Sequence, residues 1–413
     1  MKNIFLFMTL AALPAALPAQ EFSTATMRSI TFNEACALSL AKSELLAQQA
    51  EGIKRLEAAE RVIGASFRPS FELNTSQSKQ QGSAAATKGY ISGTYAIFSG
   101  MRDYISLKAA AAKTSAAELD LVRARQQLYL GVAQAYLNLL AAQREAIIRL
   151  EQLNVTGKRI TELETRVDLG KSRKSEAVAV KTQLAQDKSS YLNAAAAERG
   201  AQQALMFLTG IDTDLAPTGI SLRGGTALET FLKTALLRPD LAALRKSLDA
   251  SGYLLDAQDH NLWPAVTVSA DYYAVNHPTP DPVNRWDGTL ELKMPLYTGG
   301  AARAQRQSAY SARREAELAL QLAQRQALTE VRTAYEEFKY SALQTVSLDE
   351  ALTLALENAR CQEDDYKLGL VNNLDVLSAL NTVQQTRLAL SQARVQQIWT
   401  LAKLKNAAGL ELE

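Results

Sequence analysis

Two long stretches of the chain, over 101–168 and 300–367, place apolar residues at the spacing of one helix face. Steps of three and four positions recur in both stretches, which indicates amphipathic helices. The residues are Tyr129, Val132, Tyr136 and Leu139 in the first stretch, and Leu328, Val331, Tyr335 and Phe338 in the second. At 1.5 Å per residue each helix would be roughly 100 Å long. The pattern predicts two long helices that pack in coiled-coil-like seams, although Gly131 and Gly157 weaken it in the first.

Shorter segments ahead of each long stretch alternate apolar and polar residues, which is the pattern of a β-strand. Leu290 and Leu292, for example, alternate with Thr289 and Glu291. The expected strands span about 69–80 and 88–98 in the first half, and about 264–275 and 286–297 in the second. One apolar and one polar face over about ten residues is typical of a membrane β-barrel strand, but a soluble sandwich gives the same alternation.

The same order of elements occurs twice, roughly 200 positions apart, which is far too long for a solenoid repeat. Phe98-Ser99-Gly100 corresponds to Tyr297-Thr298-Gly299, and Leu169-Gly170 corresponds to Leu368-Gly369. Each copy runs from short helical segments through a proline and two strands into a long helix, a turn and a last helix. The chain therefore divides into a first repeat over 20–212, a linker over 213–226 and a second repeat over 227–413.

The first twenty residues have the layout of a secretory signal peptide. A lysine, Lys2, precedes an apolar run that starts at Ile4 and gives way to small residues and prolines. We expect a signal peptide over 1–19, cleaved after Ala19. An uncleaved anchor helix is the alternative, which the short, proline-interrupted run disfavours. No later run of apolar residues is long enough for a membrane-spanning helix, so an exported protein is expected.

Composition narrows the range of functions. The 413 residues contain 45 Lys and Arg against 43 Asp and Glu, and this balance excludes a strongly basic nucleic-acid binder. Only two His and two Cys occur, so we expect neither a bound metal nor a cofactor. An oxidising compartment would permit Cys36 and Cys361 to pair, but two separate buried thiols are the interpretation that we favour.

An enzyme is the first rival class. His260 and His277 are the only histidines of the sequence, and neither stands in the spacing of a catalytic triad or a metal site. Gly170-Lys171-Ser172 is similar to the end of a phosphate-binding loop, but Thr165 occupies the position of that loop's first glycine. We therefore predict no enzymatic activity.

Four strands cannot close a barrel, and open sheet edges are not tolerated in lipid. Strands that lie in a membrane would therefore require several copies of the chain. Three copies would give twelve strands, which is within the range of outer-membrane barrels.

The chain resembles the TolC-like outer-membrane efflux proteins, the outer membrane factors. The match rests on the duplicated unit of proline, two strands and (Phe/Tyr)-x-Gly, on Ala-Tyr segments in the long helices, and on Leu-Gly-x5-(Glu/Asp) at the turns. The last motif reads LGKSRKSE over Leu169–Glu176 and LGLVNNLD over Leu368–Asp375. The resemblance covers nearly the whole mature chain. It implies a mainly α fold with a β-barrel portion: a homotrimer whose 12-stranded outer-membrane barrel continues into a long α-helical coiled-coil tunnel in the periplasm.

The resemblance also implies a function. The protein would be the passive exit duct of a tripartite efflux or type I secretion system in the outer membrane of a Gram-negative bacterium, passing small molecules or proteins outward. Its partners would be a periplasmic adaptor protein, an inner-membrane transporter and outer-membrane lipid, and no nucleic acid. The alternative is an exported coiled-coil structural or adhesion protein without channel activity, which leaves the paired strands unexplained.

In that family a ring of acidic side chains closes the periplasmic tip. Asp375 matches the first acidic position, and Ser378 stands where some members carry a second Asp. Tyr366 matches a tyrosine that latches the tip in some members, whereas Val371 replaces the arginine usually discussed with it. Three copies of Asp375 around one axis would attract cations. A helix cap is an equally good interpretation of Asp375.

The resemblance makes the two turns candidates for contact with the adaptor. They comprise Gly170, Lys171, Arg173 and Lys174 in the first repeat, and Gly369, Leu370, Val371 and Asn372 in the second. Solvated turn residues are the simpler interpretation, and the one that we favour.

Overall fold

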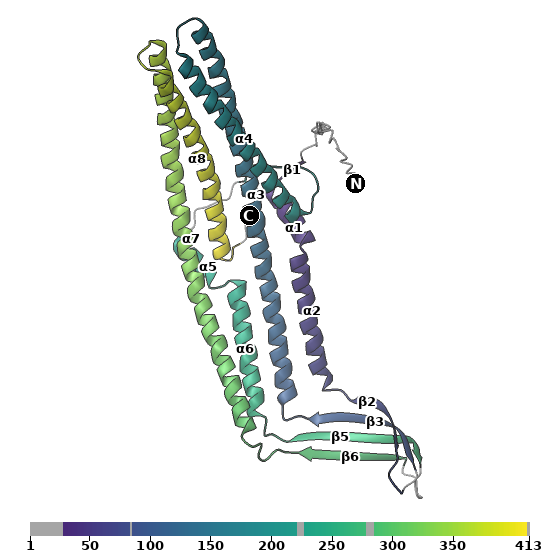
Figure 1. Cartoon of the computed structure of the whole chain (residues 1–413). Helices are drawn as coiled ribbons and strands as arrows, with labels where there is room; N and C mark the ends of the chain where they lie inside the picture. The colour runs from purple at the N-terminus through teal and green to yellow at the C-terminus, as the bar shows by residue number, and fades with distance from the viewer. Residues whose placement is uncertain (1–27, 83–84, 221–226, 278–284, 411–413) are drawn as a thin grey trace, which may run out of the picture.

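The chain folds into an elongated molecule in which long helices lie side by side and a sheet bends away at one end (Figure 1). This computed structural model describes residues 28–82, 85–220, 227–277 and 285–410. The expected signal peptide over 1–19 and the last part of the expected linker lie outside the described residues. Within the described ranges, every helix is too short or too polar to cross a membrane.

In the described residues, each repeat contributes four helices and three strands. The first repeat contains β1 (Arg28–Ile30), α1 (Phe32–Lys42), α2 (Glu44–Ala65), β2 (Ser70–Ser78), β3 (Ala86–Phe98), α3 (Arg102–Asp168) and α4 (Lys174–Thr209). The rest of the chain contains β4 (Leu215–Pro217), α5 (Leu228–Ala235), α6 (Pro239–Asp259), β5 (Ala265–His277), β6 (Trp286–Lys293), α7 (Ala301–Lys367) and α8 (Asn373–Ala407). Strands β1 and β4 form a two-stranded sheet that joins the repeats. Strand β4 follows the first repeat in the sequence and is counted here with the second.

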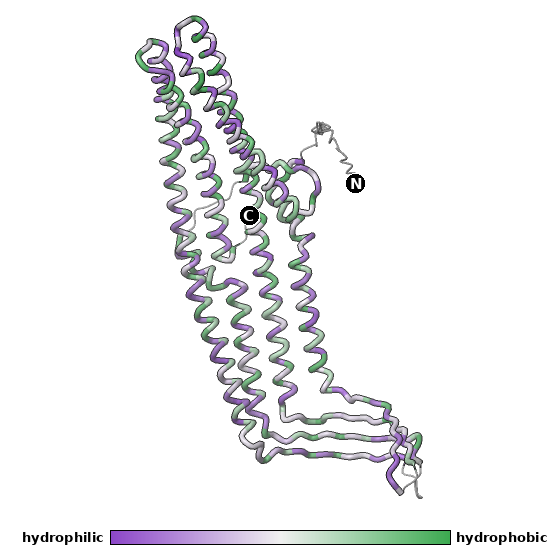
Figure 2. The backbone as a smooth tube through the Cα atoms, viewed as in Figure 1, coloured by the Kyte–Doolittle hydropathy of each residue, from purple (hydrophilic) through white to green (hydrophobic). Residues whose placement is uncertain are grey.

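The long helices α3 and α7 have 67 residues each and form the frame of the molecule. Helix α3 packs against α2, α4, α6 and α8, and α7 packs against α5, α6 and α8. The two long helices thus flank a column made of α8 and α6, one after the other (Figure 1). Gly131 and Gly157 do not interrupt α3. Hydrophobic and hydrophilic positions alternate along all of these helices, as side-by-side packing requires (Figure 2).

The four larger strands form one antiparallel sheet in the order β2-β3-β5-β6, so β3 and β5 join the two repeats. Their register brings apolar residues of all four strands to one face. One row across this face is Phe71 and Gly93 with Ala270 and Gly288, and the next is Tyr95 with Val268 and Leu290. The opposite face carries Ser92, Asp271 and Asp287 in register. The sheet therefore has one apolar and one polar face.

One strand is shorter than its sequence pattern. Strand β6 ends at Lys293, whereas the alternation predicted a strand to about 297, so that part of the prediction is wrong. Pro295 has no backbone N–H to donate to a neighbouring strand, and the ladder stops just before it. Met294 and Leu296 keep the apolar alternation without the hydrogen bonds of a strand.

The segment predicted as a linker over 213–226 contains strand β4, which pairs in parallel with β1. Both strands cover Tyr136 of α3, which is fully buried. The Tyr136 hydroxyl donates to the carbonyl oxygen of Thr218 at 2.6 Å and lies 2.9 Å from that of Ile30. Tyr136 thus ties together two three-residue strands that are far apart in the sequence.

The two cysteines are free thiols in different surroundings. Cys36 is buried in the core around Tyr136, and burial raises the pKa of its thiol to about 12. Cys361 is exposed on α7, so the prediction of two buried thiols is wrong for it. A position on the outer face of a long helix explains the difference.

A buried ionic junction forms where α8 ends and α6 begins. Arg238, the residue before α6, donates to both carboxylate oxygens of Asp240, at 2.6 and 3.1 Å. It also donates to Glu330 of α7 at 2.7 Å and to the carbonyl oxygen of Ala407 at 3.1 Å. Arg123 of α3 donates to the Asn406 carbonyl oxygen at 2.9 Å. A cation at the C-terminus of α8 complements the helix dipole, and the junction joins four helices.

The corresponding joint of the first repeat is much simpler. There the Lys42 ammonium donates to the carbonyl oxygen of Gly210, just beyond the end of α4, and this bond is exposed. Arg238, by contrast, has only 7% of its side chain exposed. The two repeats therefore share a joint but differ in how firmly it is held.

Acidification should weaken the junction. Burial raises the pKa of the Asp240 carboxyl, but hydrogen bonds and charge from Arg238 and charge from Arg123 outweigh it and hold this pKa below its usual value. A carboxyl with a lowered pKa stabilises the fold above its unfolded-state pKa, and this contribution is lost as the pH falls through the folded-state pKa.

We predict that Arg238→Gln lowers the free energy of unfolding by about 2 kcal/mol or more, because it leaves partly buried carboxylates without their cation. Lys42→Gln is the matched control at the exposed joint, and its cost should stay below about 1 kcal/mol. Urea-induced unfolding followed by circular dichroism measures both. Equal losses of unfolding free energy in the two variants would contradict the explanation that burial makes the Arg238 joint stronger.

Candidate functional site

The two helix turns predicted as contact sites lie at the same end of the molecule, opposite the sheet (Figure 1). Both long helices end in the same way. Gly170 and Gly369 have positive φ angles of 70° and 78°, a conformation that favours glycine. The next residue in each turn, Lys171 or Leu370, donates its N–H to the carbonyl oxygen five positions earlier. This pairing caps the helix and turns the chain back.

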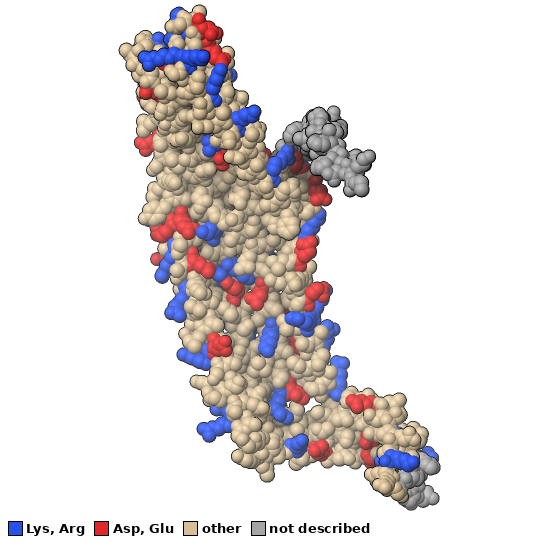
Figure 3. Space-filling view, in the orientation of Figure 1, with Lys and Arg blue, Asp and Glu red and all other residues tan. Residues whose placement is uncertain are grey.

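The first turn presents basic side chains. Lys171, Arg173 and Lys174 are all exposed, and Lys and Arg side chains lie across this end of the molecule (Figure 3). The Ser172 hydroxyl donates to a Glu176 carboxylate oxygen at 2.6 Å, which holds the turn together. The turn therefore offers positive charge on a fixed backbone.

The second turn presents apolar side chains. Leu368 and Leu370 have exposed fractions of 74% and 71%, and Leu374 at the start of α8 has 53%. Val371 is half-buried and Asn372 is exposed. The two turns thus have equivalent backbones and different chemistry, basic in one and apolar in the other.

Asp375 forms a helix cap. The Asn372 side-chain oxygen accepts hydrogen bonds from the N–H groups of Leu374 and Asp375, at 2.8 and 3.2 Å. The Asp375 carboxylate in return accepts from the Asn372 N–H at 3.1 Å, which completes a capping box. Asp375 is exposed, so its charge also remains available to solvent. Ser378, one turn further along α8, is exposed as well.

Tyr366 lies near the end of α7 and contacts α3. The guanidinium groups of Arg159 and Arg166 lie 4.6 and 4.8 Å from the centre of its ring. Cations at this range are attracted to an aromatic face. Tyr366 therefore joins the hairpin of α7 and α8 to the hairpin of α3 and α4.

Arg159 makes a second contact with the same hairpin. Its Nε donates to the side-chain oxygen of Asn373 at 2.8 Å, and Asn373 is fully buried. Only 11% of the Arg159 side chain is exposed. We call Arg159, Arg166, Tyr366 and Asn373 the tip clasp. Among these four residues, sequence reasoning found only Tyr366. Arg166 and Tyr366 lie at nearly equal distances before their turn glycines, which was the one signal that pointed to their contact.

The structure brings the predicted gate residues together only in part. Tyr366 and Asp375 lie on either side of the second turn, and Tyr366 takes its partners from α3. The hydrogen bonds of Asp375 found in the described part of the chain go to Asn372, not to Ser378. In a single chain, Asp375 and Ser378 are both exposed near the start of α8.

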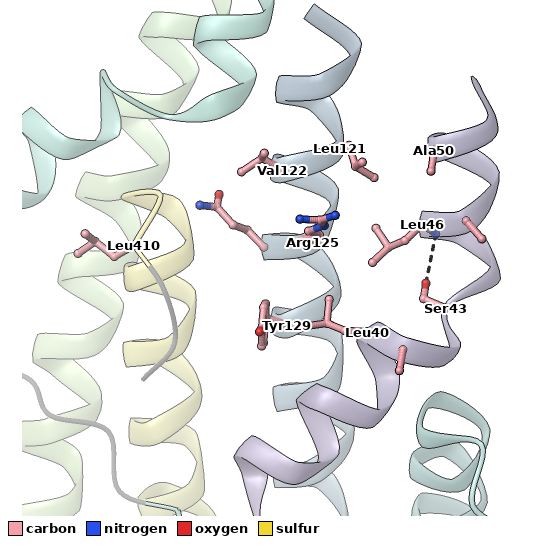
Figure 4. Close-up of a pocket in the computed structure, with 12 residues that line it drawn as sticks. Leu40, Ser43, Leu46, Ala50, Leu121, Val122, Arg125, Tyr129 and Leu410 are labelled. Carbon is pink, nitrogen blue, oxygen red and sulfur yellow. Dashed lines mark hydrogen bonds between the residues drawn. The ribbon is translucent and has the colours of Figure 1, made fainter. Parts of the chain in front are cut away.

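The grooves along the helices differ in their linings, and one of them is mainly apolar. This groove of about 540 Å³ lies beside α1, α2 and α3, and Leu46 of α2 and Leu121 of α3 point into the space between their helices (Figure 4). Arg125 is the one charged side chain among its lining residues. A search of the described ranges finds no cluster of three His, Cys, Asp or Glu side chains that could hold a metal ion. This groove offers packing surface rather than acid–base chemistry.

Comparisons with known proteins point to one family. Residues 233–410 match the family model described as "Outer membrane efflux protein". The outer membrane efflux protein BepC of Brucella suis is 23% identical over 365 residues, which cover 84% of this chain and 78% of the relative. The outer membrane protein TolC of Vibrio cholerae is 24% identical over 329 residues, which cover 74% of this chain and 73% of the relative.

The fold is shared with solved structures. A membrane protein from Pseudomonas aeruginosa superposes with a TM-score of 0.84 at 19% sequence identity, covering 92% of each chain. Because the sequence identity is low, this match establishes the fold alone. The arrangement of long helices and a four-stranded sheet is therefore one that occurs in known membrane proteins.

Proposed function

We propose, from the premise that this chain belongs to the outer membrane efflux protein family, that three copies of it form an exit duct through the outer membrane of a Gram-negative bacterium. The family forms channels rather than enzymes. The duct works passively, as the last part of a tripartite efflux or type I secretion system. It receives small molecules or proteins from an inner-membrane transporter through a periplasmic adaptor.

The four-stranded sheet carries this proposal. Its apolar face suits lipid and its polar face suits a water-filled lumen. In the described part of the chain β2 and β6 each pair with one strand, which leaves one edge of each for a neighbouring copy. Three copies would give twelve strands and remove every edge.

The helices support the same arrangement. Exposed large apolar side chains follow α7, among them Tyr310, Leu318, Leu322, Leu343 and Val346. Large apolar side chains exposed repeatedly along one helix are consistent with an interaction surface. In the proposed trimer this side of α7 packs against the α2 and α4 column of the next copy, and the wall closes into a tunnel.

Planar-bilayer recording tests the duct directly. The purified trimer should produce discrete conductance steps, and protein dissociated into single chains by heat should produce none. An exported structural or adhesion protein, the alternative class, would give no steps in either form. Absence of channels from correctly assembled trimer would refute the duct.

We further propose that the turn end of the duct is its gate, formed by Asp375, Ser378 and Tyr366. Three copies of Asp375 around the axis would repel one another and attract cations. The tip clasp supports this proposal, because it holds the α7–α8 hairpin against α3. Opening would require the contacts of Arg159 and Arg166 with Tyr366 to break.

The two turns are proposed as the adaptor contact. The first repeat offers Gly170, Lys171, Arg173 and Lys174, and the second offers Gly369, Leu370, Val371 and Asn372. Exposed charge on one turn and exposed leucine side chains on the other would present two different surfaces to the adaptor.

Breaking the tip clasp should let ions pass through the resting channel. Arg159→Gln removes one cation–π contact and one charged hydrogen bond, together about 2 kcal/mol, so the resting conductance in bilayers should rise severalfold. Arg149→Gln is the matched control on α3, because Arg149 bonds to Glu145 and Gln152 of the same helix. A resting conductance that stays unchanged in Arg159→Gln would remove the clasp from the gate.

The variant Asp375→Asn distinguishes the two roles of this residue, its charge in the proposed gate and its hydrogen bond in the capping box. The amide oxygen still accepts the Asn372 N–H, so α8 keeps its cap, while three negative charges leave the trimer. Block by multivalent cations should weaken severalfold in bilayer recordings. The control is Glu176→Gln, at the equivalent position of the first turn. Multivalent cations should block channels of this variant as strongly as they block the wild type. Unchanged block in Asp375→Asn would leave the residue as a cap alone.

A further inference from the structure

An apolar crevice lies where the helices of the first repeat meet the sheet. It has a volume of about 310 Å³ and is bounded by the end of α2, the end of β3 and the start of α3. Its apolar lining consists of Phe67, Ile97, Phe98, Met101 and Tyr104. Four of these side chains, all except Phe98, are also exposed by 37% or more. The crevice therefore opens to the surface at the junction of helix and strand.

The crevice is continuous with the apolar face of the sheet. A bulge at Ile97 shifts the register of β3, so that Phe98 pairs with Val266 of β5, and Val266 pairs with Leu292 of β6. Leu292 is 68% exposed on this face. Phe98 thus belongs both to the crevice lining and to a row of apolar residues across the sheet.

One wall of the crevice is held in an unfavourable backbone conformation. Met101 has a φ angle of 65° and is the one residue other than glycine with a positive φ in the described ranges. The corresponding residue of the second repeat is Gly300, with a φ angle of 88°. A side chain in this conformation costs of the order of 1 kcal/mol, and such strain often marks a functional position. The Met101 side chain is retained here and lines the crevice.

Basic residues adjoin the crevice. Arg68 follows Phe67, Arg102 follows Met101, and the Lys108 ammonium lies 4.6 Å from the centre of the Tyr104 ring. Arg102 uses its Nε to bond to the Ser99 carbonyl oxygen at 3.1 Å, which holds the guanidinium at the start of α3. Asp103 is the acidic residue of the lining. These four residues, Arg68, Arg102, Asp103 and Lys108, carry a net positive charge beside the crevice.

We propose that this crevice binds an anionic glycerophospholipid of the membrane leaflet nearest the helices. One acyl chain lies against the rings of Phe67, Phe98 and Tyr104, and Met101 closes the side. The phosphate and its anionic headgroup lie near Arg68, Arg102 and Lys108. Clusters of basic residues beside apolar surface at the membrane boundary bind anionic headgroups in this way. The proposal rests on the proposed function, since it requires the apolar face of the sheet to lie in the membrane.

Native mass spectrometry of the detergent-released trimer tests the binding. The probe is an equimolar mixture of phosphatidylglycerol and phosphatidylethanolamine with identical acyl chains. The wild type should retain phosphatidylglycerol in preference, up to three molecules per trimer. The double variant Arg68→Gln/Lys108→Gln should lower this retention about tenfold. The double variant Lys158→Gln/Lys188→Gln removes the same charge at exposed positions of α3 and α4 far from the crevice and should retain phosphatidylglycerol as the wild type does.

Met101→Gly tests the crevice itself. Glycine suits the positive φ angle, so the variant should melt at the wild-type temperature or above it in detergent without lipid. Its retention of phosphatidylglycerol should nevertheless fall severalfold, because the wall of the crevice is gone. Wild-type retention in this variant, or equal retention of both lipids by the wild type, would overturn the proposal.

Bilayer recording on the same preparations separates this proposal from the duct. If the trimer conducts normally but retains both lipids equally in mass spectrometry, the lipid site is contradicted and the proposed duct is not. Trimers that form no channels would contradict the duct itself.

Discussion

The outer edges of β2 and β6 carry backbone N–H and C=O groups that no other strand of the described chain pairs with. In water such groups would be solvated, but in hydrocarbon each would cost several kcal/mol. The apolar face of the same sheet, from Phe71 on β2 to Leu292 on β6, favours lipid on one side. Both requirements are met when copies of the chain join edge to edge, so the proposed trimer, its lumen and its tunnel all depend on this pairing.

The duplication gives the chain two equivalent frames, which it uses for different purposes. The joint that Lys42 holds by one exposed bond in the first repeat becomes the buried network of Arg238 in the second. The turn after α3 is basic, and the turn after α7 is apolar. Met101 retains a side chain where Gly300 has none. The two repeats share their elements, and these local differences distinguish the proposed gate, the proposed adaptor contacts and the proposed lipid site.

Long periodic elements were predictable from the sequence because many residues repeat one signal. The helices α3 and α7 differ from the expected ranges by a single residue at the start, and β6 departs only where Pro295 removes a donor. The strands β1 and β4 have three residues each, too few to show a period. The clasp of Arg159 with Tyr366 joins residues about 200 positions apart, which no local pattern contains. Asp375 was singled out through the resemblance of its turn to a family motif, but its capping partner required coordinates.

The mass of the detergent-solubilised particle tests the central requirement most directly. Multi-angle light scattering, corrected for bound detergent, measures how many chains a particle contains. If the edges of β2 and β6 must pair between copies, the particle contains three chains, each of 45.0 kDa before any processing. A stable, folded particle of one chain would contradict this account, because its sheet edges would then be satisfied without a neighbour.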